Sequence, residues 1–172
     1  MTIRINASSI QIVPWTSSDL HLLYLLNTPN MMKYLGGPES NEHILSRHNL
    51  YLELGAQKKG QMFTIMIQPL QLKVGSVGYW EKVWRNETIY EMGWNVLPEY
   101  QGNGIATLAV EKAMAVLKRN SKHHFLHAFP STHNFASNAV CRKLHFSLIG
   151  QCDFEYPRGR WMKSNNWRYK LK

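Results

Sequence analysis

The stretch Glu91-Met-Gly-Trp-Asn-Val-Leu-Pro-Glu-Tyr-Gln-Gly-Asn-Gly-Ile-Ala106 joins two different periodicities through a glycine-bearing loop. Before the loop, residues 89–96 alternate between two faces, which is the pattern of a β-strand. After the loop, apolar residues recur at helical spacing as far as Leu117. The order strand, loop, helix therefore places Gly102 and Gly104 at the start of a helix.

A helix start of this kind can bind an anion. Its first N–H groups have no partner inside the helix, and the helix dipole adds partial positive charge at the same end. Glycines let the backbone approach a phosphate closely, which predicts a phosphate or pyrophosphate ligand. The loop is neither a Walker A motif nor a dinucleotide fingerprint, and glycines that serve turn geometry alone are the alternative.

Two motifs together resemble the GNAT family of acetyl-CoA-dependent N-acetyltransferases. Gln101-x-x-Gly104-x-Ala106 is similar to the family's pyrophosphate loop, and the segment from Asn134 through Ser137 to Phe146 is similar to its second signature. Residues 10–19 also resemble the opening of the branch that acetylates ribosomal-protein N termini. The resemblance covers nearly the whole chain.

The predicted elements agree with that family's fold. We expect a first strand within residues 3–12, helices over 20–26 and about 41–54, and strands over 62–67, 74–83 and 89–96. A helix after Gly104, a strand over 125–129, a helix after Asn134 and a final strand pair complete the chain. Ser17 or Ser18 is the expected cap of the first helix, and Gly55 is the expected stop of the second. One α/β domain over residues 1–172 follows, with a mixed, mostly antiparallel sheet of about seven strands and about four flanking helices.

The resemblance implies acetyl-CoA as co-substrate and an amine as acceptor. Family backbone groups hold the pantetheine arm at a strand position, a loop holds the pyrophosphate, and a side chain before the last helix contacts the coenzyme. The matching residues here are Trp94, Asn95, Val96, Gln101, Gly102, Asn103, Gly104, Ile105, Ala106 and Asn134.

Acyl transfer to an amine needs a base, because an ammonium cannot attack and a lysine-like amine is about one part in two thousand neutral at pH 7. Glu91 is the best candidate, since a family carboxylate often acts from this position. The alternative for Glu91 is an ion pair with a neighbour such as Arg85. For Asn134 the alternative is an ordinary helix cap.

The chain departs from the family pattern at two positions. Many members carry a tyrosine, which protonates the leaving thiolate, where this chain has Cys141. Ser137 is therefore the expected donor, and Cys141 the expected packing residue. His145 replaces a glycine before Phe146, which puts in doubt a turn that needs positive φ.

Charge is unevenly distributed along the chain. Residues 1–111 hold 8 Lys and Arg against 9 Asp and Glu, whereas residues 112–172 hold 12 against 2. Coenzyme A, a nucleic acid or solvent alone would each suit such a basic half. We expect no nucleic-acid partner, and a homodimer stays open.

Several other classes of site and location are disfavoured. The longest apolar run, residues 22–26, is too short for a bilayer, and the N terminus lacks the apolar core of a signal peptide, so we expect a cytoplasmic protein without a membrane partner. Cys141 and Cys152 fit neither a metal spacing nor a disulfide framework. His123, His124 and His127 have no nearby carboxylate in the sequence, and we expect no metal.

The family's acceptor pocket forms between the early helices and the final hairpin. The hairpin region of this chain supplies Phe154, Tyr156, Arg158, Arg160, Trp161 and Trp167, and no acid follows Glu155. A place in the core of the hairpin is the alternative for the aromatic residues. A peptide N terminus, or a small amine with an acidic or aromatic part, fits this composition better than a polyamine. A coenzyme-binding module without turnover and an RNA-binding protein are the competing functions.

Overall fold

A seven-stranded sheet forms the centre of the computed structural model, which describes residues 5–172. Its strand order is β1-β2-β3-β4-β5-β7-β6, and every neighbouring pair is antiparallel except β4 and β5. The strands are β1 (Ile10–Pro14), β2 (Gly60–Ile67), β3 (Leu72–Trp84), β4 (Glu87–Val96), β5 (Phe125–Ala128), β6 (Ser147–Glu155) and β7 (Trp161–Lys170). The expected mixed, mostly antiparallel sheet is confirmed.

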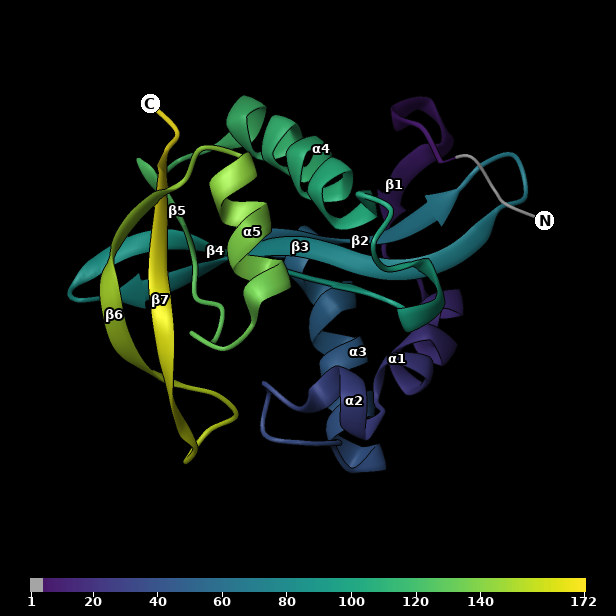
Figure 1. Ribbon diagram of the computed structural model, residues 1–172, viewed down its shortest axis with the longest axis horizontal. Helices are drawn as coiled ribbons and strands as arrows, with labels where there is room; N and C mark the ends of the chain where they lie inside the picture. Colours follow the sequence, from purple (N-terminus) through teal and green to yellow (C-terminus); the bar gives the residue numbers. More distant parts are fainter. Residues whose placement is uncertain (1–4) are drawn as a thin grey trace.

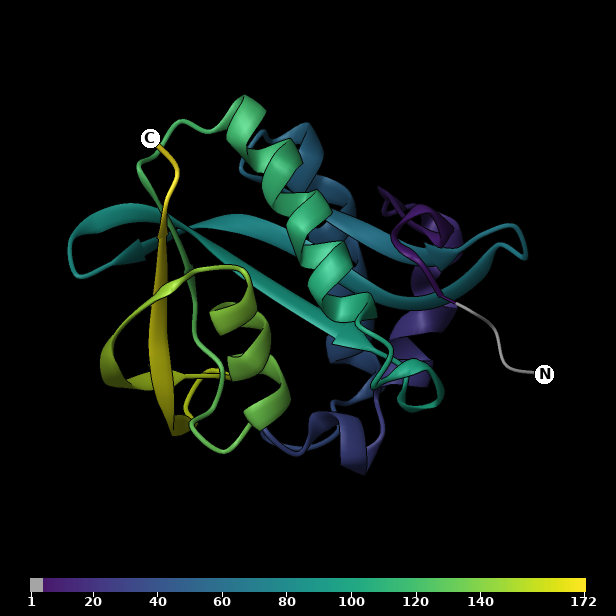
Figure 2. The same cartoon turned by 45° about the horizontal axis from the view of Figure 1, so that its top comes forward.

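Helices cover both faces of the sheet (Figure 1). One face carries α4 (Ile105–Asn120) and α5 (Phe135–Lys143), and the other carries α1 (Leu20–Leu26), α2 (Pro29–Met32) and α3 (Asn41–Ala56). Figure 2 shows α4 lying across the strands that precede it. The one-turn helix α2 was not expected; Thr28 caps it by accepting a hydrogen bond from the Met31 N–H at 3.2 Å.

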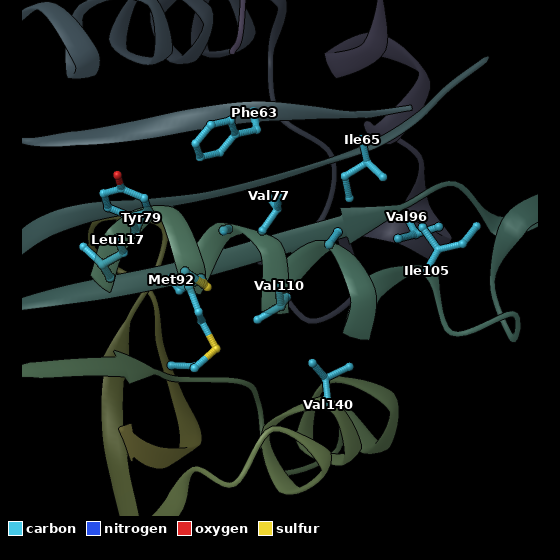
Figure 3. Close-up of a cluster of buried hydrophobic side chains, with 14 of the residues drawn as sticks. Phe63, Ile65, Val77, Tyr79, Met92, Val96, Ile105, Val110, Leu117 and Val140 are labelled. Atoms are coloured by element: carbon cyan, nitrogen blue, oxygen red, sulfur yellow. The ribbon is translucent and has the colours of Figure 1, made fainter. Parts of the chain in front are cut away.

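The main core lies between the sheet and α4, as the two periodicities predicted (Figure 3). Met92 and Val96 on alternate positions of β4 face Val110 and Leu117, which lie on one side of the helix. All four side chains are buried. Burying each aliphatic side chain contributes about 1.5–3 kcal/mol, so this layer fixes α4, and with it the loop at its start, against the sheet.

The early helices α1 and α3 begin where they were predicted, but the cap of α1 and the end of α3 differ from the prediction. Ser17 and Ser18 lie inside a 3-10 turn before α1, where the Asp19 carboxylate accepts a hydrogen bond from the Thr16 N–H at 2.8 Å. Helix α3 passes through Gly55, and Lys58 takes the left-handed conformation (φ 55°) that ends it. The expected first strand begins only at Ile10, and residues 3 and 4 of that prediction lie outside the described residues.

The turn after α5 forms despite its histidine. The Phe146 N–H donates to the Cys141 carbonyl at 3.0 Å and the His145 N–H donates to the Arg142 carbonyl at 3.1 Å. These bonds make a Schellman motif, in which His145 occupies the left-handed position with φ 63°. The doubt about this turn is resolved: the chain keeps it and accepts the strain of a β-carbon there.

The described helices include none that is both long and apolar enough to cross a bilayer.

Candidate functional site

Gly104 begins helix α4 without a side-chain cap. Its φ of 76° is left-handed, as is the φ of 77° at Gly102, and a β-carbon at either position would meet no atom within 4 Å. Asn103 braces the loop by donating to the carbonyls of Tyr100 (3.1 Å) and Gln101 (3.2 Å). Because no side chain within residues 5–172 caps the start of α4, its first N–H groups are left for an external acceptor such as an anion.

Residues 98–106 contain no lysine or arginine. An anion at this loop therefore depends on backbone N–H groups and the helix dipole for its stabilisation. Much of the basic half of the chain lies elsewhere, with Lys118 and Arg119 in the last turn of α4 and Arg142 and Lys143 in the last turn of α5. Because α4 has sixteen residues, its basic end is about 20 Å from the loop.

Strands β4 and β5 separate immediately after Glu91. Their parallel pairing covers only Tyr90 with Leu126 and Glu91 with His127, although β4 continues to Val96 against β3. Figure 1 shows the strands β5 to β7 turned away from β1 to β4. The last five residues of β4 therefore have one edge without a partner strand.

The register shows which backbone groups face that open edge. The Leu97 N–H donates to the Val74 carbonyl of the β3 side at 2.8 Å, so the odd-numbered residues of β4 point their backbone groups toward β3. The backbone groups of Trp94 and Val96 consequently face the gap, where the Gln101 amide nitrogen donates to the Val96 carbonyl at 2.8 Å. Asn95 differs from the expectation, because its backbone points toward β3.

Glu91 is held by two residues of β3 through a single oxygen. Its Oε2 lies 3.2 Å from Lys82 Nζ and accepts a hydrogen bond from Trp80 Nε1 at 3.2 Å. Burial raises the pKa of Glu91, and the neighbouring Lys82 and Trp80 oppose that rise. Among residues 5–172, no hydrogen bond to Oε1 is present, so Oε1 is the oxygen that is free to accept a proton.

The ion-pair partner of Glu91 is Lys82, whereas Arg85 was the suggested one. Arg85 instead lies over the Trp84 ring, 5.2 Å from its centre. The β3–β4 turn could have revealed the true partners, because Arg85 and Asn86 both have positive φ and form a two-residue hairpin turn. Counting back from that turn places Trp80 opposite Glu91.

The second signature forms the start of helix α5. Asn134 Oδ1 accepts a hydrogen bond from the Ser137 N–H at 3.1 Å, so this side chain is a helix cap, whatever else its amide contacts. Ser137 is half-buried, whereas Cys141 one turn later is fully buried, and burial raises the pKa of its thiol to about 12. Of the two, only Ser137 is accessible to solvent.

Neighbouring Asn138 anchors α5 to the final hairpin. Its Oδ1 accepts hydrogen bonds from Trp167 Nε1 (2.7 Å) and Asn165 Nδ2 (2.8 Å), and its Nδ2 donates to the carbonyls of Ser131 and Asn134. Because this buried amide is fully paired, it holds the Ser137 helix in one position. Trp167, which we had considered for the acceptor region, is thereby a core residue.

A cavity opens on the opposite face of β4, beside Asn95. It lies between α1, α2, α3 and the β6–β7 loop, and its polar lining comes from Asn27, Glu39, Arg47, Tyr51, Asn95 and Tyr156. Its volume of about 40 Å³ is far below the ~300–1,000 Å³ of sites that enclose a whole ligand. One small chemical group is the most that it admits in this conformation.

The other hairpin residues have different positions. Arg160 donates to the Gly36 carbonyl at 2.8 Å, Phe154 is buried beneath Lys82, and Trp161 is 66% exposed. Two of the three histidines considered as metal ligands have other partners. His123 Nε2 lies 2.9 Å from Glu81 Oε1, and His127 Nδ1 lies 2.7 Å from Asn166 Oδ1. In the described part of the chain, no group of His, Cys, Asp and Glu residues could hold a metal ion.

Solved structures share this fold over almost the entire chain. The acetyltransferase from Salmonella typhimurium that modifies the N-terminal serine of ribosomal protein L7/L12 has a TM-score of 0.78 at 20% identity, covering 98% of this chain and 99% of that one. Spermidine N-acetyltransferase from Vibrio cholerae, solved with CoA and spermine, has a TM-score of 0.77 at 18% identity, covering 95% and 96%. Ribosomal-protein-S5-alanine acetyltransferase from Vibrio fischeri has a TM-score of 0.78 at 18% identity, covering 99% and 98%.

No curated protein matches the chain in sequence at a significant level. The model of the acetyltransferase (GNAT) domain, however, matches residues 9–147, which include the Gly104 loop, the open edge of β4 and the Asn134 helix. The chain belongs to the GNAT acetyltransferase family.

Proposed function

We propose that this protein transfers an acetyl group from acetyl-CoA to a primary amine, at a peptide or protein N terminus or on a small molecule. One observation carries the proposal: the open edge of β4 leads directly to the uncapped start of α4. A strand edge can pair with the amides of pantetheine, and a helix start can bind a pyrophosphate, so this path matches coenzyme A in chemistry and in order.

In this proposal the coenzyme contacts are divided among three segments. The backbone of Trp94 and Val96 binds the pantetheine arm and the thioester, residues 101–106 bind the pyrophosphate, and Asn134 contacts the coenzyme from the start of α5. Asn95 is reassigned to the acceptor side, because its side chain lines the cavity there.

The reaction forms one bond and breaks one. The amine nitrogen attacks the thioester carbonyl carbon, the carbon–sulfur bond breaks, and the products are an acetamide and the free thiol of coenzyme A. Glu91 accepts the proton that the nitrogen loses, and Ser137 donates a hydrogen bond to the departing thiolate. Glu91 precedes Trp94 by three residues, about 10 Å along a strand, and the proton reaches Glu91 directly or through water.

The acceptor reaches the thioester from the cavity side of β4. The neighbouring structures include an enzyme that modifies the N-terminal serine of a ribosomal protein and a spermidine N-acetyltransferase. No acid follows Glu155 in this chain, which favours a peptide N terminus or a small amine over a polyamine. The proposal requires neither a nucleic acid nor a second copy of the chain, and a cytoplasmic location stays a prediction.

Thiol release in the presence of acetyl-CoA and a panel of amines tests the proposal. Glu91→Gln keeps the shape of the side chain and removes its basicity, so we expect turnover to fall about 10²- to 10⁴-fold at nearly unchanged coenzyme affinity. Binding of acetyl-CoA without thiol release from any amine would support a binding module instead. Wild-type turnover in the variant from pH 6 to 9 would assign the base to another group.

A further inference from the structure

Arg47 and Glu39 form a fixed ion pair in the wall of the cavity beside Asn95. Arg47 Nε and Nη2 both donate to Glu39 Oε1, at 3.0 Å and 2.6 Å. Asn27 holds Glu39 through two further hydrogen bonds, from the Glu39 N–H (2.8 Å) and to the Glu39 carbonyl (2.9 Å). The two opposite charges therefore balance each other locally, and the guanidinium is held in one orientation.

The hydroxyl of Tyr156 completes this group. It accepts a hydrogen bond from Arg47 Nη2, so its own proton is not used in that bond. Burial raises the pKa of Tyr156 to about 12, and the phenol therefore keeps its proton at neutral pH. Among the hydrogen bonds within residues 5–172, none has the Tyr156 hydroxyl as donor. The Tyr51 hydroxyl, one turn further along α3, also interacts with the Arg47 guanidinium, and all three side chains line the cavity.

Contacts between two loops fix the positions of the Arg47 and Tyr156 side chains. Arg160, on the same loop as Tyr156, donates to the Gly36 carbonyl, and Gly36 lies three residues before Glu39. A β-carbon at Gly36 would come within 2.7 Å of Pro157 Cδ, so glycine is required for this close approach. The cavity wall is thus held in place before any acceptor arrives, which reduces the entropic cost of binding.

The cavity lies next to the place where the reaction occurs in the proposed function. Asn95 lines the cavity and directly follows Trp94, whose backbone faces the coenzyme gap. One residue advances about 3.3 Å along a strand, which is similar to the distance between an α-amino nitrogen and its own carbonyl oxygen. An amine at the thioester could therefore extend the adjacent carbonyl into the cavity.

We propose that Arg47 and Tyr156 bind the carbonyl oxygen next to the acceptor amine, so that the acceptor class is an α-amino carbonyl compound, as at a peptide N terminus. The inference rests on the proposed acetyl transfer. Two directed donors suit an oxygen with two lone pairs, and the paired Glu39 leaves no net negative charge to attract a second ammonium group. A simple alkylamine would leave both donors unpaired, which costs affinity.

Steady-state kinetics with glycinamide and ethylamine test this assignment, since only glycinamide has the carbonyl. Tyr156→Phe removes one hydroxyl and should lower kcat/KM for glycinamide about three- to tenfold, mainly through KM, and leave ethylamine unchanged. Comparing each amine with itself across variants cancels the difference in amine basicity. Tyr24→Phe is the matched control, because the exposed Tyr24 hydroxyl bonds Asn41 outside the cavity lining and its loss should change neither rate.

Arg47→Lys provides a second measurement. It keeps the charge beside Glu39 but loses the two-pronged guanidinium, so the selective loss for glycinamide should recur. An equal loss for both amines, or no loss for either, would overturn the assignment of these residues. If acetyl-CoA raises the melting temperature but the wild type releases no thiol with any amine, the proposed function fails, and the inference fails with it.

Discussion

Replacing Lys82 by methionine should move the acidic side of the pH–rate profile toward higher pH. Lys82 Nζ is 3.2 Å from Glu91 Oε2, and it also lies 4.2 Å from the centre of the Phe154 ring. Methionine keeps most of the packing against Phe154 and removes only the charge. Without the cation, the carboxylate of Glu91 loses its nearest stabilising partner, and the pKa that burial already raises should rise further.

The distance sets the size of the effect. Two unit charges 3.2 Å apart interact by about 5 kcal/mol at an effective dielectric constant of about 20, which is an upper limit here. The side chains are 28% and 14% exposed and the Trp80 hydrogen bond to Glu91 remains. One opposite charge nearby changes the proton affinity of a carboxylate by about tenfold to a thousandfold. For Glu91 in Lys82→Met we expect a proton affinity about ten- to a hundredfold higher than in the wild type.

The direction of the change in the pH–rate profile follows from the form of Glu91 that acts as a base. Only the carboxylate accepts a proton, so activity falls as the pH drops through the pKa of Glu91. The deficit of Lys82→Met in kcat/KM relative to wild type should therefore grow as the pH falls and level off at about ten- to a hundredfold at the acidic end of the profile, whereas at alkaline pH the two enzymes should agree. The ratio of variant to wild type at each pH cancels the titration of the amine.

Lys163→Met is the matched control for this measurement. Lys163 also pairs with a carboxylate, Asp153 at 2.7 Å, but both side chains are about two-thirds exposed and neither lies near Glu91 in the strand register. Its profile should match wild type. A Lys82→Met profile that lies below wild type by the same factor at every pH would refute the electrostatic role of Lys82.

Three further results are expected. In a thermal-shift assay, acetyl-CoA at a hundredfold over its Kd should stabilise the protein by about 2.7 kcal/mol. Gly104→Val should abolish this gain. Gly159→Val is the control, because it also replaces a glycine at positive φ (87°), and it should retain the gain. Ser137→Ala should lower turnover tenfold or more at nearly unchanged coenzyme affinity. Cys141→Ala should lower only the free energy of unfolding, by about 0.5–3 kcal/mol in urea. If Cys141→Ala is instead the slower enzyme, Cys141 and not Ser137 serves the leaving thiolate. His145→Gly should stabilise the fold by up to about 1 kcal/mol in the same unfolding assay, because glycine relieves the left-handed strain, and a loss of stability would contradict that reading.

The central part of the fold could be predicted from the sequence because its signals are local. Alternation over residues 89–96 and helical spacing after Gly104 each describe neighbouring residues, and the structure has β4 and α4 at these places. Helix ends were harder to predict. Gly55 carries the residue type of a stop, but the packing of α3 extends the helix past it, and Lys58 takes the left-handed conformation.

In the candidate site, too, some residues could be predicted from the sequence and others could not. The motif residues Gln101, Gly104 and Asn134 could be chosen from the sequence, because one short loop and one helix start hold them. No motif identifies the ion-pair partner of Glu91, because Lys82 and Arg85 are both close in sequence. The partner follows only once the Arg85-Asn86 turn has fixed the strand register that places Lys82 beside the carboxylate.

The sequence by itself determined the strand, the glycine loop and the helix that define the coenzyme side, since φ, ψ and hydrogen bonding there depend on adjacent residues. Only the tertiary structure decided the separation of β4 from β5 and the meeting of Arg47 with Tyr156, which are 109 residues apart. Contacts at such separation depend on how whole elements pack and on which loops close. No short pattern of residues encodes them, so the acceptor side became visible only in three dimensions.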